Sequence, residues 1–148
     1  MAMLARDVMT PDPACCSPNA TLENVAQMMV HNDCGEIPVV DPTGHPVGVI
    51  TDRDIAIRAV AEGKSPDTPV REIMSQELLY CFDDQELEEV ARNMADIKVR
   101  RLPVLNRDKR LVGIVSLGDL SQKEQPEVTA KVVSNISKPG GKHSQAVQ

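Results

Sequence analysis

The stretch GVITDRDI, residues 48–55, and the stretch GIVSLGDL, residues 113–120, decide how this chain is organised. Each begins with a glycine and an apolar run typical of a buried strand, and each continues into a segment where a helix is expected. The strand is expected to pass into the helix at residues 51–54 and 116–119, which are called the joints below. Each joint carries a hydroxyl, Thr51 or Ser116, followed by a carboxylate, Asp54 or Asp119. A polar joint that occurs twice, 65 residues apart, predicts an internal repeat.

The repeat extends far beyond the two joints. Residues 6–56 align with residues 71–121 without a gap. Identical pairs in this register include Met9 and Met74, Cys16 and Cys81, Leu22 and Leu87, Pro38 and Pro103, Gly48 and Gly113, and Asp54 and Asp119. A single register held over this length indicates that both halves adopt the same local fold.

Each repeat is expected to form a β-α-β-β-α unit. After a short strand near Cys16, helical spacing places Leu22, Val25, Ala26, Met29 and Val30 on one apolar face, and the second repeat matches it with Leu87, Val90, Ala91, Met94 and Ala95. The runs 37–40 and 47–50 flank a turn and are typical of a hairpin, and a helix follows from about Asp54 to Ala61.

The expected fold class is therefore α/β (α+β), with two repeats packed on each other around a pseudo-twofold axis, because a repeat of this size does not bury both sheet faces alone. The predicted divisions are repeat 1 at 6–62, a connector at 63–70, repeat 2 at 71–121 and an extension at 122–148. The extension is expected to hold a short amphipathic helix and then a flexible tail.

Composition excludes several classes of function. A net charge of −6 and an aromatic content of 1% oppose nucleic-acid binding. No apolar run approaches a membrane span, so a cytoplasmic location is expected. The four cysteines lack the spacing of a zinc site or a disulfide framework, and the three histidines have no partners at catalytic spacing. Neither a phosphate-binding loop nor a nucleophile elbow occurs, so the chain is expected not to be an enzyme.

The repeated motifs resemble those of a tandem CBS domain pair, the module named after cystathionine beta-synthase, in its small stand-alone bacterial form. The resemblance rests on VMT at 8–10 and IMS at 73–75, on IPVV at 37–40 and LPVL at 102–105, and on the two glycine-to-aspartate joints. It implies a regulatory module, without another cofactor, that binds AMP, ADP, ATP or S-adenosylmethionine in clefts between the repeats. It also implies a homodimer that passes a conformational signal to an unknown regulated protein.

The joint itself has two interpretations. A hydroxyl followed three residues later by a carboxylate is a capping box, in which both side chains satisfy N–H groups at a helix start. A carboxylate can also accept both hydroxyls of a ribose. The resemblance implies the second role, with Asp54 and Asp119 on ribose and Thr51 and Ser116 on phosphate or ribose.

The resemblance also implies where the remaining ligand groups bind. The adenine is expected beside Cys16, Cys34 and Ile37 in repeat 1, or Cys81, Val99 and Leu102 in repeat 2. Phosphate is expected at Arg101, helped by Arg100 and Arg53, because guanidinium forks suit phosphate oxygens, although these arginines could equally be solvated or paired. Repeat 1 has Glu36 where repeat 2 has Arg101, so the two clefts are expected to be unequal.

Two other functions remain open at this point. The chain could be a scaffold for dimerisation or partner binding whose clefts bind no ligand. It could also be a thiol or metal sensor that uses Cys15, Cys16 and Cys34. Apolar packing is the alternative explanation for these cysteines, because free cysteine is among the most buried residue types.

Overall fold

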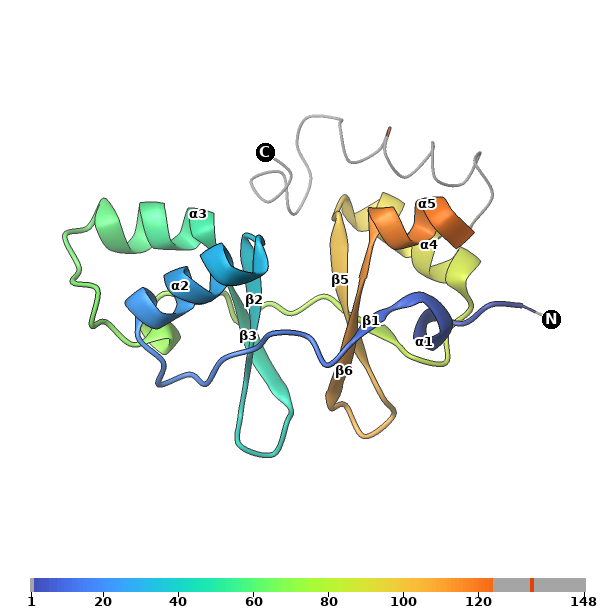
Figure 1. Ribbon diagram of the computed structural model, residues 1–148, viewed down its shortest axis with the longest axis horizontal. Helices are drawn as coiled ribbons and strands as arrows, with labels where there is room; N and C mark the ends of the chain where they lie inside the picture. Colours follow the sequence, from blue (N-terminus) through green and yellow to red (C-terminus); the bar gives the residue numbers. More distant parts are fainter. Residues whose placement is uncertain (1, 124–133, 135–148) are drawn as a thin grey trace. The chain divides into compact units, whose positions relative to one another are not determined.

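The computed structural model describes residues 2–123 and residue 134, and it divides the chain into two compact units (Figure 1). Unit 1 comprises Met1–Pro13 and Leu79–Gln148, and unit 2 comprises Ala14–Leu78. Both units combine helices with sheet strands, which confirms the predicted α/β class. The helix expected in the extension lies outside the described residues. Within the described part of the chain, none of the helices has the length and apolar character needed to cross a bilayer.

Unit 2 contains helix α2 (Leu22–Asn32), the hairpin of β2 (Glu36–Val40) and β3 (Pro46–Thr51), and then α3 (Asp52–Asp54), which continues as the π-helical η1 (Ile55–Val60). A short 3-10 helix, η2 (Val70–Glu72), follows the connector. The hairpin is antiparallel. Two isolated bridges extend it, because Cys16 pairs in parallel with Val39 and Ser75 pairs antiparallel with Val49.

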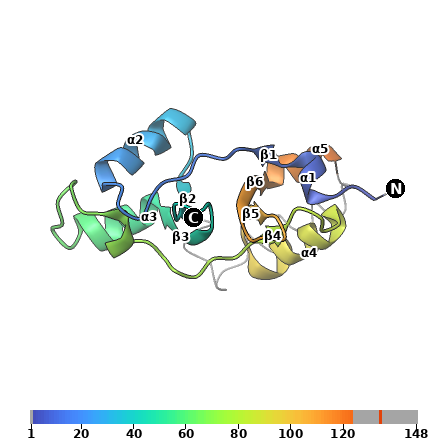
Figure 2. The ribbon, with the colours of Figure 1, turned by 90° about the horizontal axis from the view of Figure 1, so that it is seen from below.

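Unit 1 contains α1 (Ala5–Val8), β1 (Thr10–Pro11), β4 (Cys81–Phe82), α4 (Leu87–Ile97), β5 (Arg101–Leu105), β6 (Leu111–Ser116) and α5 (Leu117–Lys123). Its sheet has the order β1-β6-β5-β4 (Figure 2). Strand β4 runs parallel to β5, whereas β1 and β5 are both antiparallel to β6. The same order describes unit 2 if the bridges at Ser75 and Cys16 take the places of β1 and β4.

The outer strand of each unit comes from the beginning of the other sequence repeat. Thr10, at the start of repeat 1, pairs with Ile114 in β6, and Ser75, at the start of repeat 2, pairs with Val49 in β3. The compact units therefore cut the sequence repeats after Pro13 and after Leu78. An exchange of this kind is invisible to a repeat alignment, because both copies exchange the same segment.

Gly48 and Gly113 are the residues that allow the exchanged strand to approach. A Cβ at Gly48 would lie 2.5 Å from the Ser75 carbonyl oxygen and 3.0 Å from the Met74 sulfur. A Cβ at Gly113 would lie 3.0 Å from the Thr10 carbonyl oxygen and would overlap the Met9 sulfur. The glycine that opens each repeated stretch is therefore required because another backbone passes directly over it.

Each unit has its own apolar core. In unit 1, the five apolar residues predicted for the face of α4 are all buried. In unit 2, Leu22, Val25 and Met29 of α2 are buried and Ala26 is partly buried, but Val30 is 82% exposed, so the predicted apolar face is not buried at Val30. At about 100° per residue, Val30 lies about 80° around the helix from Leu22, at the edge of the apolar stripe. The smaller Ala95, its counterpart in α4, is buried.

Candidate functional site

Both repeated joints form a capping box at the start of a helix. In unit 2, the Thr51 hydroxyl oxygen accepts the N–H of Asp54 at 3.0 Å, and Asp54 Oδ2 accepts the N–H of Thr51 at 3.0 Å. In unit 1, Ser116 Oγ accepts the N–H of Asp119 at 3.3 Å, and Asp119 Oδ2 accepts the N–H of Ser116 at 2.8 Å. The helix-capping interpretation of the joint is thus confirmed for both copies.

The box uses only one oxygen of each carboxylate. Asp54 Oδ1 lies outside it, 3.8 Å from Nε of the half-exposed Arg58, which is too far for a hydrogen bond. In Asp119 the box and the Ser116 hydroxyl, at 3.1 Å, both use Oδ2. Both carboxylates are only partly buried. Capping and ligand binding are therefore compatible, because Oδ1 can accept a further hydroxyl while Oδ2 holds the helix start.

A loop lies directly beside each joint. The Gly35 carbonyl accepts the N–H of Asp52 at 2.9 Å, and the Arg100 carbonyl accepts the N–H of Leu117 at 3.0 Å. Both loops begin with a left-handed residue that ends the preceding helix, Asp33 with φ 50° and Lys98 with φ 59°. The two units thus build the same arrangement from different side chains.

Of the residues predicted to bind adenine, Cys34, Ile37, Val99 and Leu102 lie in or next to these loops, whereas Cys16 and Cys81 pair with Val39 and Val104 further along the strands. Their exposed fractions are small: Cys16 7%, Ile37 1%, Cys81 1%, Val99 8% and Leu102 1%. Cys34 is partly buried and packs against the core of unit 2. The backbone N–H groups of Cys34 and Val99 already bond to Met29 and Met94, at 3.0 and 3.2 Å. A ligand that forms hydrogen bonds with the backbone at these two positions would therefore donate to carbonyl oxygens, because both N–H groups already donate within the chain.

The charged residues predicted to bind phosphate lie at the surface. Arg53, Arg100 and Arg101 are all exposed. Arg101 stands opposite Ser116 in the β5–β6 pair, and Glu36 stands opposite Thr51 in the β2–β3 pair. Each joint is therefore flanked by a charge on the neighbouring strand, basic in unit 1 and acidic in unit 2. The ligand roles of these residues stay predictions.

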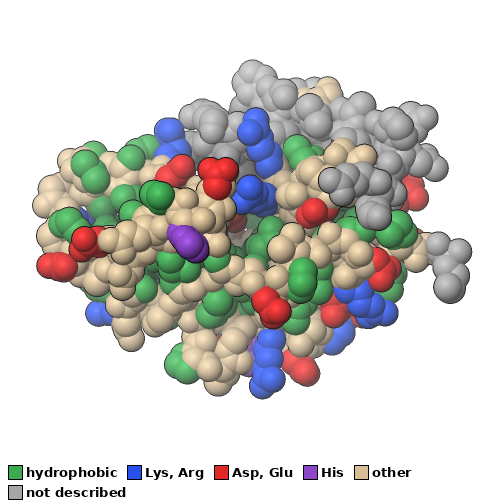
Figure 3. Space-filling view, viewed as in Figure 1, with side chains coloured by type: hydrophobic (Ala, Val, Ile, Leu, Met, Phe, Trp, Pro, Cys, Tyr) green, Lys and Arg blue, Asp and Glu red, His purple; other side chains and the backbone are tan. Residues whose placement is uncertain are grey.

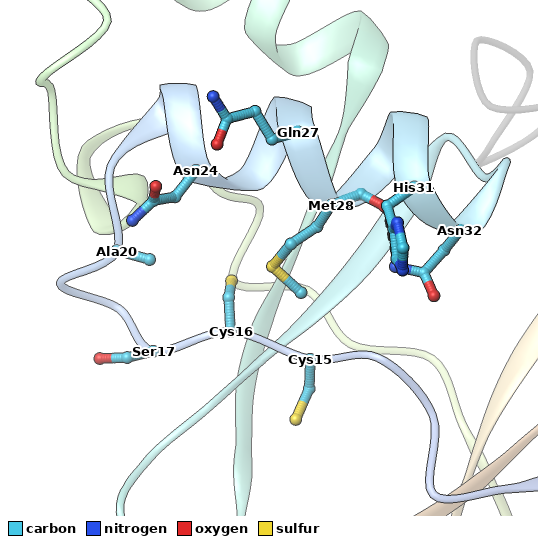
Figure 4. Close-up of a pocket in the computed structure, with 9 residues that line it drawn as sticks. All are labelled: Cys15, Cys16, Ser17, Ala20, Asn24, Gln27, Met28, His31 and Asn32. Atoms are coloured by element: carbon cyan, nitrogen blue, oxygen red, sulfur yellow. Dashed lines mark hydrogen bonds between the residues drawn. The ribbon is translucent and has the colours of Figure 1, made fainter.

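Unit 2 also has a surface pocket of about 470 Å³ between α2 and the segment before it (Figure 4). Its lining consists of Cys15, Cys16, Ser17, Ala20, Asn24, Gln27, Met28, His31 and Asn32. Figure 4 shows the Cys16 sulfur directed toward the helix and the Cys15 sulfur directed away from it. Among the predicted ligand-binding residues only Cys16 lines this pocket. The polar residues of α2 gave no signal in the sequence, because exposed positions of an amphipathic helix are ordinarily polar.

Cys15, Cys16 and Cys81 do not have the electrostatics of reactive cysteines. Burial raises the pKa of Cys16 to about 11, with a further contribution from Cys15, and burial also raises the pKa of Cys15. Burial and the Asp83 carboxylate raise the pKa of Cys81 to about 12. Reactive cysteines have lowered pKa values. Among the residues that the structure describes, no three histidine, cysteine or acidic side chains gather as a metal site would require.

Comparison with known proteins agrees with the repeat. The family model described as the CBS domain matches residues 5–60 and again residues 70–124. The CBS domain-containing protein YhcV of Bacillus subtilis is 41% identical over 133 residues, covering 89% of this chain and 94% of that protein. Hypoxic response protein 1 of Mycobacterium tuberculosis is 32% identical over 136 residues, covering 91% of this chain and 94% of that protein.

Solved structures give the same result. A structure of hypoxic response protein I with two coordinated zinc ions has a TM-score of 0.75, at 32% identity, and covers 83% of this chain and 100% of that one. The CBS domain pair of protein MJ0100, in complex with 5-methylthioadenosine and S-adenosyl-L-methionine, has a TM-score of 0.70 at 28% identity, covering 82% and 95%. CBSX2 in complex with AMP has a TM-score of 0.70 at 26% identity, covering 80% and 93%.

Proposed function

The chain belongs to the CBS domain family and carries two copies of the domain, and from this premise we propose that it is a non-catalytic regulatory module that binds adenosyl ligands at its two strand-to-helix joints. The observation that carries the proposal is the second carboxylate oxygen, Oδ1, of Asp54 and of Asp119. It lies outside the capping box in both units, and a backbone hydrogen bond ties each joint to the loop beside it. Relatives of the same fold bind AMP or S-adenosyl-L-methionine.

Each joint supplies the groups that an adenosine needs. Oδ1 of the aspartate accepts a ribose hydroxyl, while Oδ2 keeps the helix start and so fixes the carboxylate in place. Under this proposal the adenine lies at the start of the strand beside the loop, near Cys16 and Ile37 or near Cys81 and Leu102, whose side chains are almost fully buried. Next to them, the carbonyl oxygens of the loop can accept its exocyclic amine. The proposed site therefore binds a nucleoside through its ribose and its adenine.

A regulatory module of this kind acts through differential binding. A ligand that binds one conformation of the chain more tightly than another raises the population of that conformation. A regulated protein that binds this conformation then responds to the ligand. The size of the response is limited by the difference between the two affinities. The ligand is thus the signal, and the chain is its sensor.

A second candidate, a dimerisation scaffold, has one observation in its favour. Ile57 and Val60 on η1 and Val30 on α2 are 47%, 71% and 82% exposed, so unit 2 presents apolar side chains on its helices. A metal or thiol sensor has less support. Hypoxic response protein I holds two zinc ions, but the described residues of this chain contain no group of three potential ligands, and burial raises the thiol pKa values.

The proposal is tested by measuring the affinity for AMP, ATP and S-adenosylmethionine by calorimetry, together with ligand-free melting curves, in Asp54→Asn and Asp119→Asn. Asparagine keeps an oxygen that can accept the backbone N–H of the box, but it loses the charge and one acceptor. We expect small changes in melting temperature and a loss of affinity of about 10- to 100-fold for the ligand of the altered joint, equivalent to about 1.5 to 3 kcal/mol for a hydrogen bond to a charged group.

The alanine variants serve as the control for the helix cap. Asp54→Ala and Asp119→Ala remove both roles, and we expect them to lower stability by about 0.5 to 2 kcal/mol in addition to weakening binding. If no adenosyl ligand raises the melting temperature of the wild type, or if both asparagine variants bind as tightly as the wild type, the proposed function is wrong. A bound ligand at 100 times its Kd would add about 2.7 kcal/mol, which a melting curve detects easily.

A further inference from the structure

The two joints and their loops carry opposite net charges, and the sign is reversed at two matching pairs, Asp33 with Lys98 and Glu36 with Arg101. In unit 2, the loop and joint residues 33–36 and 51–54 hold four acidic side chains and one basic one, Asp33, Glu36, Asp52, Asp54 and Arg53. In unit 1, residues 98–101 and 116–119 hold three basic side chains and one acidic one, Lys98, Arg100, Arg101 and Asp119. The unit 2 joint therefore has an excess of three negative charges and the unit 1 joint an excess of two positive charges.

The strand register places the charges at positions 36 and 101 next to the hydroxyl groups of the two joints. Glu36 is paired with Thr51, and Arg101 is paired with Ser116. Directly opposite residues of an antiparallel pair project from the same face, with Cβ atoms about 4.5 to 5.5 Å apart. The charge at position 36 or 101 therefore lies on the same side of the sheet as the hydroxyl of the joint, within reach of any ligand that contacts that hydroxyl.

One of the acidic side chains of unit 2, Asp52, packs against the loop at Gly35. A Cβ at Gly35 would lie 2.8 Å from the Asp52 carboxylate oxygen Oδ2, so the Asp52 side chain occupies the space that a side chain at position 35 would need. In unit 1, the matching positions hold Arg100 and Leu117, and the backbone hydrogen bond between them is the same. An aspartate over a glycine in one unit is thus replaced by a leucine beside an arginine in the other.

The basic residue nearest to Asp54 has a counterpart in the other repeat. Arg58, whose Nε lies 3.8 Å from Asp54 Oδ1, matches Lys123 in the sequence register, so both repeats have a basic residue at this position. Arg58 also donates a hydrogen bond to the Ile73 carbonyl at 3.1 Å. The contrast between the joints therefore comes from the loops and from positions 36, 52, 101 and 117.

We propose that the two joints divide adenosyl ligands by charge: the unit 1 joint takes an adenosine that carries phosphate, and the unit 2 joint takes an adenosine whose 5′ substituent is cationic, such as a sulfonium. This proposal rests on the proposed function, because the shared aspartate and hydroxyl supply the adenosine site in both units and the surrounding charges decide only the substituent. Guanidinium groups at Arg100 and Arg101 match phosphate oxygens, whereas Glu36 and Asp52 repel phosphate and attract a sulfonium or ammonium group.

The test is calorimetry on the full chain with AMP, with S-adenosylmethionine and with the neutral 5′-methylthioadenosine, in the wild type and in four variants. Asp119→Asn and Arg101→Glu should each weaken AMP binding at least tenfold and leave S-adenosylmethionine binding unchanged. Asp54→Asn should weaken S-adenosylmethionine binding at least tenfold and leave AMP binding unchanged. Glu36→Arg should weaken S-adenosylmethionine and add a second AMP site. Because Arg100, Arg101 and Asp52 are exposed, high salt should reduce the preference for each charged ligand.

Lys109→Glu provides the matched control. It changes charge by the same amount as Arg101→Glu, but it lies in the turn at the opposite end of the β5–β6 hairpin. It should leave both affinities unchanged. The division by charge is wrong if AMP binding is lost in Asp54→Asn, if both ligands compete for one joint, or if Arg101→Glu and Lys109→Glu behave alike. The proposed function itself is wrong if none of the three ligands binds, including the neutral one, so the two failures are distinguishable.

Discussion

Asp54 and Asp119 show how one residue can satisfy two interpretations of a sequence. The spacing of hydroxyl and carboxylate predicts a capping box, and both boxes are present, with all four backbone hydrogen bonds between 2.8 and 3.3 Å. The box does not argue against a ligand, because it consumes Oδ2 and leaves Oδ1. It also means that a loss of stability in an alanine variant is not evidence against binding, so affinity is the deciding measurement.

At the same scale, the buried cysteines give a prediction of pH dependence. The pKa values of Cys16 and Cys81 are raised from an ordinary value of 9.0 to about 11 and about 12, chiefly by burial. The unfolded chain therefore loses these protons at lower pH than the folded chain does. Their contribution to stability is fully present below about pH 9 and is lost as the pH rises through about 11 for Cys16 and about 12 for Cys81.

Urea unfolding at pH values on either side of 9.0 measures this effect. We expect the free energy of unfolding of the wild type to fall across the alkaline range, and the double variant Cys16→Ala, Cys81→Ala to show a shallower fall from a lower starting stability. Cys15→Ser is the comparison variant: Cys15 is exposed, and burial raises its pKa less strongly than the pKa of Cys16 or Cys81, so this variant should keep most of the fall. An equally steep fall in the double variant would assign the effect to other groups.

At the scale of the element, the exchanged strands explain why the repeated stretch begins with glycine. Ser75 and Thr10 pass over Gly48 and Gly113, and their carbonyl oxygens occupy the space beside each Cα. The strands are short: β1 has two residues, and the pairing at Ser75 is a single bridge. Such short pairings hold only if nothing separates the backbones, so the glycine fixes where each outer strand can bind.

This gives the second prediction: Gly48→Ala and Gly113→Ala each lower the free energy of unfolding by about 1 to 3 kcal/mol, the usual cost of overpacking. We expect a larger loss of stability at Gly48 than at Gly113. The atom nearest to the added Cβ is a backbone oxygen at Gly48, whereas at Gly113 it is the flexible end of Met9. Gly118→Ala is the control, because a Cβ there would lie 3.5 Å from its nearest neighbour, the Ser116 oxygen. Equal losses at Gly118 and Gly48 would contradict the role given to the outer strand.

The sequence predicted most of these elements because their signals are local. Helix periodicity placed α2 and α4, and the apolar runs around a turn placed both hairpins, within a few residues of their bounds. The strand exchange could not be predicted, because the partner of Thr10 lies about a hundred residues away and a repeat alignment is identical with or without exchange. The pocket beside α2 was missed for a similar reason, since its polar lining joins segments whose proximity is set by tertiary packing.

At the scale of the whole molecule, the two repeats also differ on their helices. Hydrophobic side chains reach the surface over the helices of unit 2 (Figure 3). In the sequence register, Val30, Ile57 and Val60 correspond to Ala95, Gln122 and Gln125, so the second repeat has no large apolar residue at any of these positions. The exposed apolar side chains on the helices of unit 2 favour association of that unit with its own copy, as in a twofold interface.

The last prediction is therefore a homodimer held by the helices of unit 2. Light scattering at high micromolar concentration should give the mass of a dimer for the wild type, and Val60→Glu should give a monomer with little change in melting temperature, because Val60 is 71% exposed and contributes little to the core. Val47→Glu is the matched control: Val47 is also a partly exposed valine of unit 2, at 37%, but it lies in β3 rather than on a helix, so this variant should remain dimeric. A monomeric wild type, or a dimer that Val47→Glu disrupts and Val60→Glu does not, would show that the exposed residues of α2 and η1 have another purpose.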